Sequence, residues 1–279
     1  MSKPFVVVDA FVTADAFSGN PAGVLLLETF RDDAWLQGVA DELHQAETAF
    51  AVPAGDGSFA LRWFTPTAEV ALCGHATLAC AHYLWEAGRL APNRPAQFDT
   101  RSGRLIARRH AEAIVLDFPA VPATTIKPPP SLEPALSGQT PLWTGITDAH
   151  DPGERNVLAV LPDEDAVRAL VPDLRAVEQL PAGGLIVTAA GNDGDVVSRY
   201  FAPAYGIPED PVTGSAHCTI GPYWSATRGA QLQARQLSAR GGRLHITTTD
   251  SGRVLLQGQA RTAIRGTIEP TPGHLTRPG

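Results

Sequence analysis

Residues Arg62 to Trp85 read RWFTPTAEVALCGHATLACAHYLW, and residues Arg199 to Trp224 read RYFAPAYGIPEDPVTGSAHCTIGPYW. Each copy leads from a strand-like segment through a proline-containing loop to a glycine, Gly74 or Gly214, that opens an apolar, helix-like run. The second copy carries three extra residues in its loop. Because the repeat is far longer than a solenoid period, it predicts a duplicated domain and not an array of small units.

The run that follows the first glycine is apolar on nearly all sides from residue 76 to residue 85. Such a helix must be buried all round, and a curved sheet wrapped around it provides that burial. We therefore predict an α+β fold of two similar lobes, each with several strands around one long helix. Six prolines between Pro119 and Pro134 mark the boundary, so we assign residues 1–127 to an N-terminal lobe and residues 128–279 to a C-terminal lobe.

Three other patterns predict particular elements. Trp35, Val39 and Leu43 recur at helical spacing, which predicts a helix over residues 31–45. Residues 96–109 have the composition of a strand after the first central helix. Residues 253–264 are strand-like as well, and we expect them to close the C-terminal lobe.

The bulk properties exclude several classes of function. The chain of 279 residues is 44% hydrophobic and 18% charged, as in ordinary globular proteins, and its formal net charge is −7. Since the sequence has no run of Lys or Arg, we expect neither nucleic acid nor membrane as a partner. The N-terminus lacks the apolar run of a signal peptide, and three cysteines without a CxxC pair favour a cytoplasmic location.

The two glycines have a chemical meaning because the first turn of a helix presents free backbone N–H groups and a partial positive charge. If both helices point into one cleft, they can hold a carboxylate without Lys or Arg. The same field would stabilise an enolate that forms beside that carboxylate. The alternative is that Gly74 and Gly214 only permit tight turns into the helices.

Three titratable residues near these motifs are candidates for chemistry, each with a structural alternative. His75 follows Gly74, and the helix N-terminus should lower its pKa and favour the neutral ring, unless the residue is only structural. Asp210 either caps the entry to the second helix or orients His75 or a substrate amine. Glu47 directly precedes an apolar strand, and its alternative is a solvated loop carboxylate.

Neither a metal nor a cofactor is expected. The sequence has no HExxH pair and no carboxylates at calcium-loop spacing. It also lacks GxGxxG and GxxxxGK[ST] loops, so a nucleotide cofactor has no support.

The motifs GNPAGV, ETAF, FTPTAEVALCGHATLA and EDPVTGSA, in this order, resemble the PhzF family of phenazine biosynthesis. The resemblance extends from about residue 5 to about residue 265. It implies the diaminopimelate-epimerase fold, with two pseudo-symmetric lobes, each a β-barrel-like sheet around a central helix, and a site in the cleft between them. It further implies a cofactor-free enzyme, usually a homodimer, whose namesake isomerises trans-2,3-dihydro-3-hydroxyanthranilate by moving a proton.

The resemblance also assigns roles to residues. It implies that Glu47 shuttles the proton with help from His75, Asp210 and Ser215. The substrate carboxylate would lie on the amides near Gly74 and Gly214, and the remaining candidates for substrate binding are Asn20, Thr213 and Cys73.

Related epimerases and racemases of this fold use two thiols, one before each helix glycine. Here Cys73 precedes Gly74, but Thr213 precedes Gly214, and a hydroxyl cannot replace a thiol as a base near neutral pH. A single base at Glu47 therefore fits better than a pair. We predict an isomerase that moves a proton and a double bond in a small carboxylate-bearing substrate, such as a phenazine precursor or an unsaturated cyclic amino acid. An amino-acid racemase using Cys73 and a non-catalytic binding protein remain the alternatives.

Overall fold

The computed structural model describes residues 2–149, 152–193 and 195–269. Within these residues all strands join into one hydrogen-bonded sheet of seventeen strands. The helices are α1 (Asp33–Leu43), α2 (Gly74–Glu86), α3 (Leu132–Ala135), α4 (Glu164–Ala169), α5 (Leu174–Glu178) and α6 (Gly214–Arg228), with 3-10 turns η1 (Pro152–Glu154) and η2 (Pro203–Tyr205). The strands of the first half are β1 (Lys3–Ala10), β2 (Asn20–Leu26), β3 (Glu47–Pro53), β4 (Phe59–Phe64), β5 (Glu69–Val70), β6 (Ala96–Thr100), β7 (Gly103–His110) and β8 (Ala113–Pro119). The strands of the second half are β9 (Ala123–Thr125), β10 (Trp143–Thr147), β11 (Asn156–Val160), β12 (Gly184–Ala190), β13 (Val196–Phe201), β14 (Gln231–Gln236), β15 (Gly242–Thr248), β16 (Arg253–Gly258) and β17 (Ala260–Ile268).

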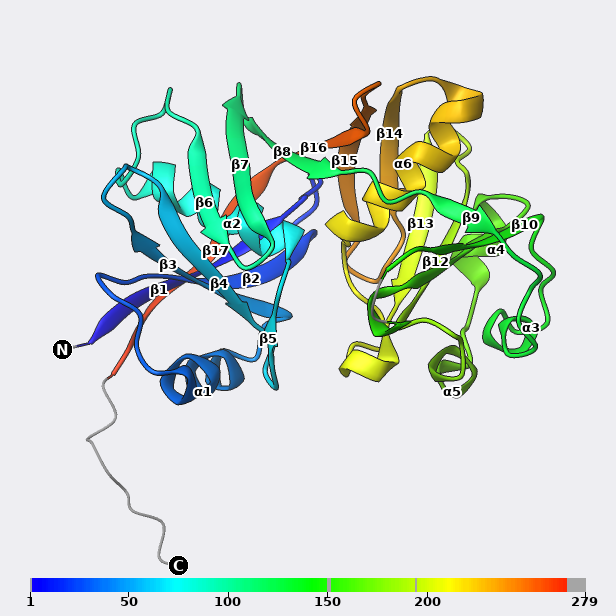
Figure 1. The fold of residues 1–279 in the computed structure, drawn as a ribbon, viewed down its shortest axis with the longest axis horizontal. Coiled ribbons are helices and arrows are strands. Elements are labelled where there is room, and N and C mark those ends of the chain that lie inside the picture. Colours follow the sequence, from blue (N-terminus) through cyan, green and yellow to red (C-terminus); the bar gives the residue numbers. More distant parts are fainter. Residues whose placement is uncertain (1, 150–151, 194, 270–279) are drawn as a thin grey trace, which may run out of the picture.

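Both glycines of the sequence repeat begin a helix, as predicted. α2 packs against β1, β2, β3, β7, β8 and β17, whereas α6 packs against β14, β15 and β16 (Figure 1). In α2 every residue from His75 to Ala81 is buried, in agreement with a run that is apolar on nearly all sides. Each long helix therefore lies against its own set of strands, and the division of the chain at residue 127 and the pseudo-symmetry stay predictions.

The N-termini of α2 and α6 contact each other directly. A methyl group added to Gly74 would lie 3.5 Å from the Cα atom of Gly214, and the reverse distance is also 3.5 Å. One continuous cluster of buried apolar residues extends across this contact and includes Ala76 and Leu78 of α2 together with Ala216 and Ile220 of α6. The two helices thus share one core where they meet.

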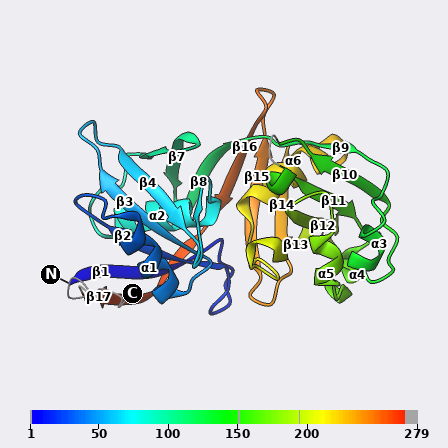
Figure 2. The same ribbon diagram turned by 60° about the horizontal axis from the view of Figure 1, so that its bottom comes forward.

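The end of the chain returns to its beginning. β17 pairs antiparallel with β1, from Lys3 opposite Ile268 to Ala10 opposite Ala260, and the two strands lie side by side in Figure 2. The prediction that residues 253–264 form one strand of the C-terminal lobe is wrong after Gly258. The reason is that β1 is paired on its other edge with β2, and its buried Val6, Val7 and Val8 need a further strand beside them; periodicity identifies a strand but not its partner.

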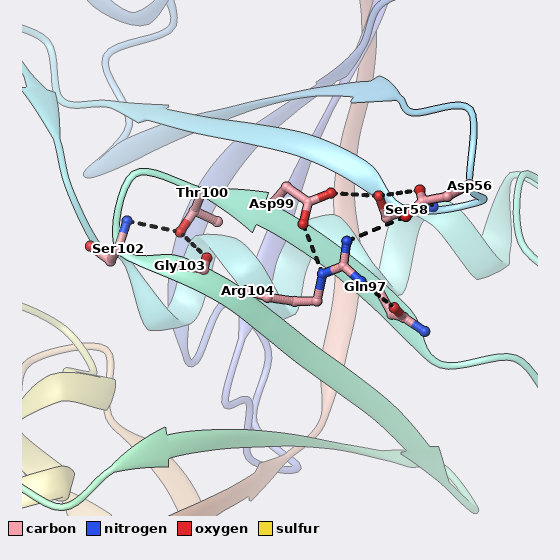
Figure 3. A network of polar contacts seen from close by, with 8 residues as sticks. All are labelled: Asp56, Ser58, Gln97, Asp99, Thr100, Ser102, Gly103 and Arg104. Carbon is pink, nitrogen blue, oxygen red and sulfur yellow. Dashed lines mark hydrogen bonds and ion pairs between the residues drawn. The ribbon is translucent and has the colours of Figure 1, made fainter.

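The predicted strand over residues 96–109 is also interrupted. The chain turns between Thr100 and Gly103, where Gly103 adopts a positive φ of 96°, and β6 pairs with β7 as a hairpin. The Thr100 hydroxyl donates to the Gly103 carbonyl oxygen at 2.7 Å and accepts the Ser102 N–H at 3.1 Å. Figure 3 shows how the hairpin is tied to the loop after β3: Arg104 contacts Asp99 and Asp56, and the Ser58 hydroxyl lies 2.6 Å from both carboxylates.

The predicted helix over residues 31–45 is confirmed as α1. Asp32 precedes it and accepts the N–H of Trp35 at 2.8 Å, so it caps the helix. Its buried face packs on β2, β3 and β4 in a separate apolar cluster that includes Leu36 and Phe50.

Among the described helices, none combines the length and the apolar character that a crossing of the membrane requires.

Leu256 provides a test of the shared core beneath the helix contact. This fully buried residue of β16 faces Leu116 of β8 in the sheet, and its Cδ1 atom lies 3.6 Å from the Cβ position of Gly214. We expect Leu256→Ala to lower the free energy of unfolding by about 2–5 kcal/mol, because it leaves a cavity under α6. Urea denaturation measures the change. The matched control is Leu255→Ala, one residue earlier on the other face and only partly buried, and equal losses in both variants would contradict the assignment.

Candidate active site

Glu47 is the first residue of β3, which runs between β2 and β4 in the sheet. The pairing places Glu47 opposite Ala22, at the end of the strand that is nearest to the start of α2. Its side chain is 12% exposed, and its Oε2 atom lies 3.0 Å from Nε2 of His75. The carboxylate is therefore a buried partner of the imidazole and not a solvated loop group.

His75 lies between three side chains that face its two ring nitrogens. Nε2 faces Glu47, whereas Nδ1 lies 3.2 Å from Nδ2 of Asn20 and 3.5 Å from Sγ of Cys73. Within the described residues, neither Nε2 nor Oε2 of Glu47 makes a hydrogen bond of favourable geometry. The two facing atoms are thus a close, buried pair whose main interaction is with each other.

Asn20 connects the two halves of the cluster. It is the first residue of β2 and has no exposed surface. Its Nδ2 atom donates to Oδ1 of Asp210 at 2.8 Å and to the carbonyl oxygen of Val212 at 2.9 Å, with His75 as a third neighbour. Because an amide nitrogen has only two hydrogens, these contacts to protein atoms occupy it fully. Its Oδ1 atom has no partner among the described residues, and its predicted contact with substrate stays a prediction.

Asp210 accepts hydrogen bonds on both carboxylate oxygens. Asn20 donates to Oδ1, and the hydroxyl of Thr213 makes a short hydrogen bond to Oδ2. Asp210 is 6% exposed, and burial raises its pKa to about 6, against the lowering effect of the His75 charge. The carboxylate therefore changes its charge close to neutral pH.

Gln236, at the end of β14, belongs to this cluster although no sequence motif contains it. Its amide nitrogen donates to the carbonyl oxygen of Asp210 at 2.7 Å and to Oγ1 of Thr213 at 3.2 Å. Its amide oxygen accepts the N–H of Thr213 at 2.9 Å. Leu232 and Ala234 lie on the same, buried face of β14 as Gln236. A polar residue at a buried position of this alternating strand was therefore the only sign of Gln236 in the sequence.

The side chains at the N-caps of α2 and α6 do not bond to the backbone N–H groups of the first helical turn. Neither Cys73 before α2 nor Thr213 before α6 caps its helix through the side chain. The space directly between Gly74 and Gly214 is filled by their own backbones, so an anion would lie beside the pair and not between the two residues. Ser215 is exposed at the start of α6 and, in the described part of the chain, makes none of the hydrogen bonds that join the other residues.

The electrostatics of His75 differ from the sequence-based expectation. Burial by itself lowers the pKa of His75, but the adjacent Cys73 and Glu47 groups raise it well above its ordinary value. The prediction of a lowered pKa was wrong because a carboxylate at 3.0 Å outweighs the potential of the helix N-terminus. The pKa of Cys73 is also raised, to about 11, by burial and by the charge of Glu47. This upward shift is what an inert thiol requires.

Glu47, Cys73 and His75 also form a group of potential metal ligands, each offering an atom within 4.8 Å of the others. A zinc ion needs its ligands at about 2.0–2.3 Å and a single imidazole nitrogen. Here the ring separates the other two residues, because Cys73 faces Nδ1 and Glu47 faces Nε2. This arrangement fits hydrogen bonding along the ring better than coordination of one ion.

Two large cavities of the described structure lie away from these residues. One of about 510 Å³ is lined by Arg168, Arg235 and Arg243 among others, and one of about 760 Å³ is lined by Pro129, Pro134 and Pro181 among others. Neither includes Glu47 or His75. The arginines of the first cavity are largely paired, since Arg235 binds Glu164 and Asp195.

A family model described as "Phenazine biosynthesis-like protein" (PhzC-PhzF) matches residues 8–266. The chain belongs to the PhzC-PhzF family. The match confirms the resemblance of the motifs and covers both glycine-opened helices. Members of this family therefore provide the relevant relatives in sequence and structure.

Curated PhzC-PhzF relatives are similar over almost their whole length. An "uncharacterized isomerase" of Halalkalibacterium halodurans is 44% identical over 272 residues, which cover 96% of this chain and 99% of that protein. A "phenazine biosynthesis-like domain-containing protein" of Homo sapiens is 39% identical over 291 residues, with 96% and 99% covered. These relationships support an isomerase of the PhzF type.

Solved structures agree with the predicted fold. A PhzF-family protein from Enterococcus faecalis has a TM-score of 0.89 at 39% identity and covers 97% of this chain and 100% of its own. A hydroxyproline epimerase from Agrobacterium vitis has a TM-score of 0.61 at 12% identity, with 96% and 92% covered, and shares the fold alone. The PhzC-PhzF chain is thus a mixed α+β protein with an epimerase-like fold.

Asp210 gives a pH-dependent test of the cluster. Its folded-state pKa of about 6 lies above the ordinary value of 3.8, so the stability it contributes is fully present below pH 3.8 and is lost as the pH rises through about 6. We expect Asp210→Asn to gain about 3 kcal/mol of unfolding free energy relative to the unmodified protein between pH 3.5 and pH 7.5, since each pKa unit corresponds to about 1.4 kcal/mol. Urea denaturation of both proteins at the two pH values measures this difference. A constant difference across this range would contradict the raised pKa.

Proposed function

We propose that the protein is a cofactor-independent isomerase that moves a proton, and with it a double bond, in a small carboxylate-bearing substrate. The observation that carries the proposal is the position of Glu47, a nearly buried carboxylate beside His75 at the contact of two uncapped helix N-termini. General acid–base catalysis needs one group that can both accept and return a proton next to the reacting carbon. Among the residues brought together here, Glu47 is the carboxylate that pairs with His75 and can take up and return a proton.

The first step takes a proton from carbon. The Glu47 carboxylate accepts the proton from the saturated carbon at one end of the conjugated system, and the electron pair of the broken C–H bond enters that system, where it is delocalised toward the substrate carboxylate as a dienolate. The N–H groups at the starts of α2 and α6 lie beside this charge and stabilise it. No other reactant is needed, because the proton stays on Glu47.

The second step returns the same proton to a different carbon. The electron pair of the dienolate forms the new C–H bond at the far end of the conjugated system, and Glu47 becomes a carboxylate again. His75 faces Glu47 through Nε2, so its N–H can bond to the carboxylate as the proton leaves and comes back. A single carboxylate serves one face of the substrate, and the transfer is therefore suprafacial.

The other residues of the site have supporting roles in this proposal. Asp210 holds Asn20 in place beside His75, with Nδ2 of Asn20 3.2 Å from Nδ1 of the ring, and Ser215 is available to the substrate because it is exposed at the start of α6. Gly74 and Gly214 allow the substrate to approach the backbone closely. Substrates of this chemistry include phenazine precursors and unsaturated cyclic amino acids. The expected homodimer and cytoplasmic location are part of the same proposal.

A racemase that uses Cys73 is the weaker candidate. Its thiol has a pKa raised to about 11 by burial, which disfavours the thiolate that would act as base. On the other side of the contact, the hydroxyl of Thr213 is bonded to Asp210, so Thr213 does not serve as a second base. A racemase needs two bases on opposite faces of one carbon.

Glu47→Gln tests the proton shuttle. The amide keeps the size of the side chain but cannot accept a proton from carbon, so we expect turnover to fall at least about a hundredfold. The rate of double-bond migration in trans-2,3-dihydro-3-hydroxyanthranilate, or in an unsaturated cyclic amino acid, is followed by NMR. Glu42→Gln, on the exposed side of α1, is the matched control. A Glu47→Gln protein that keeps its fold and a near-normal rate would refute this assignment.

The route of the proton separates the isomerase from the racemase. Because the base is nearly buried, we expect part of a substrate deuterium to appear in the product at the new position in H₂O, and Cys73→Ala to keep most of this activity. Mass spectrometry and NMR of the product measure the transfer. The proposal would be abandoned if the protein interconverted the enantiomers of proline and if Cys73→Ala abolished that reaction.

A further inference from the structure

Gln236 is a buried amide that connects a strand of the sheet to the loop before α6. It is the last residue of β14 and is 1% exposed. Its neighbours in the sheet are Ser198 of β13 and Gly242 of β15, so the backbone is held on both sides and the side chain has a fixed origin. A buried amide is costly unless both its ends are bonded.

Both ends are bonded to Asp210 and Thr213, two residues of the loop that precedes α6. The amide oxygen accepts the N–H of Thr213, and the amide nitrogen donates to the carbonyl oxygen of Asp210 and to the hydroxyl oxygen of Thr213. A hydroxyl has one proton. Because Gln236 already donates to this oxygen, the single proton of Thr213 is directed to Oδ2 of Asp210.

We propose that Gln236 is a positioning residue of the site: by donating to the Thr213 hydroxyl oxygen, it keeps the hydroxyl proton directed to Asp210 and opposes a protonated Asp210 that would donate to this oxygen. An amide is suited to this role because it presents a donor and an acceptor at fixed places. Neither Leu nor Glu at this position could accept from the backbone and donate to the hydroxyl together. This inference rests on the proposed function at one point, namely that Asp210 takes part in the reaction.

The direction of this hydrogen bond matters for the charge of Asp210. Donation from Thr213 and Asn20 favours the ionised carboxylate and opposes the effect of burial. The other groups that face Asp210 are His75 of α2, whose charge lowers its pKa, and Glu47 of β3, whose charge raises it. Tyr200 of β13 also lies near, and burial together with the charge of Asp210 raises its pKa. Loss of the Thr213 donation should therefore move the titration of Asp210 upward.

The experiment reads this titration directly, without substrate. The side-chain carboxyl carbon of Asp210 is followed by ¹³C NMR from pH 4 to pH 9 in the full chain, with assignment from Asp210→Asn. In Gln236→Met, which keeps the length and adds no charge, we expect the midpoint to rise by about one pH unit, because a protonated Asp210 can then donate to the Thr213 hydroxyl oxygen. Thr213→Val should give a similar rise. Combining the two changes should add little, because both remove the same interaction.

A matched control lies on the same strand. Gln233 of β14 is exposed, and Gln233→Met should leave the midpoint of Asp210 in place. Gln236→Glu is the second variant if the Met protein does not fold. It keeps the size and an acceptor for the Thr213 N–H, and we expect its midpoint to rise further because a carboxylate attracts the Thr213 proton.

The outcomes separate positioning from a purely structural role. A rise in Gln236→Met that matches Thr213→Val and is not additive with it supports the proposal. An unchanged midpoint in a folded Gln236→Met or Gln236→Glu protein, or full additivity with Thr213→Val, would overturn it. The titration experiment measures no turnover and is therefore independent of the isomerase proposal. If only the isomerase proposal fails, the titrations follow the expected pattern in a protein that moves no double bond.

Discussion

The contact between the N-termini of α2 and α6 is the constraint on which the site depends. A methyl group on either of the two glycines there would already touch the other, and this approach brings residues from both parts of the chain together. The contact also has an electrostatic cost, since the positive ends of two helix dipoles face the same place. The carboxylates of Glu47 and Asp210 lie beside these ends and offset that cost. The proposed site for an anionic substrate depends on how the two helices meet.

The polar cluster at this contact forms one connected path. It runs from Gln236 through Thr213, Asp210 and Asn20 to His75, and ends at Glu47. The end at Gln236 is fully bonded, whereas Glu47 Oε2 and His75 Nε2 lack a well-aligned partner within the described residues. Buried polar groups are normally satisfied, and exceptions concentrate at functional places. The path is thus fully hydrogen-bonded at Gln236 and ends in the buried pair of His75 and Glu47.

The sequence was sufficient for the elements and the helix starts but not for all of their partners. The motifs around Gly74 and Gly214 identified the family and both helices, because helix entry is a local property. The clustering of Glu47, His75 and Asp210 followed from the family resemblance. Gln236 could not be found in this way, since its role depends on a strand that meets the loop before α6 in space. The charge of His75 was misjudged for a similar reason: the helix end is visible in sequence, but the facing carboxylate is not.

The pairing of β1 with β17 has a consequence for the chain while it is being synthesised. The ribosome makes β1 before β17, and all the other strands of the sheet are synthesised between them. Until β17 has been made, one edge of β1, with its run of valines, lacks this partner and can pair with another chain. The order of synthesis therefore leaves this strand edge open to association while the chain grows.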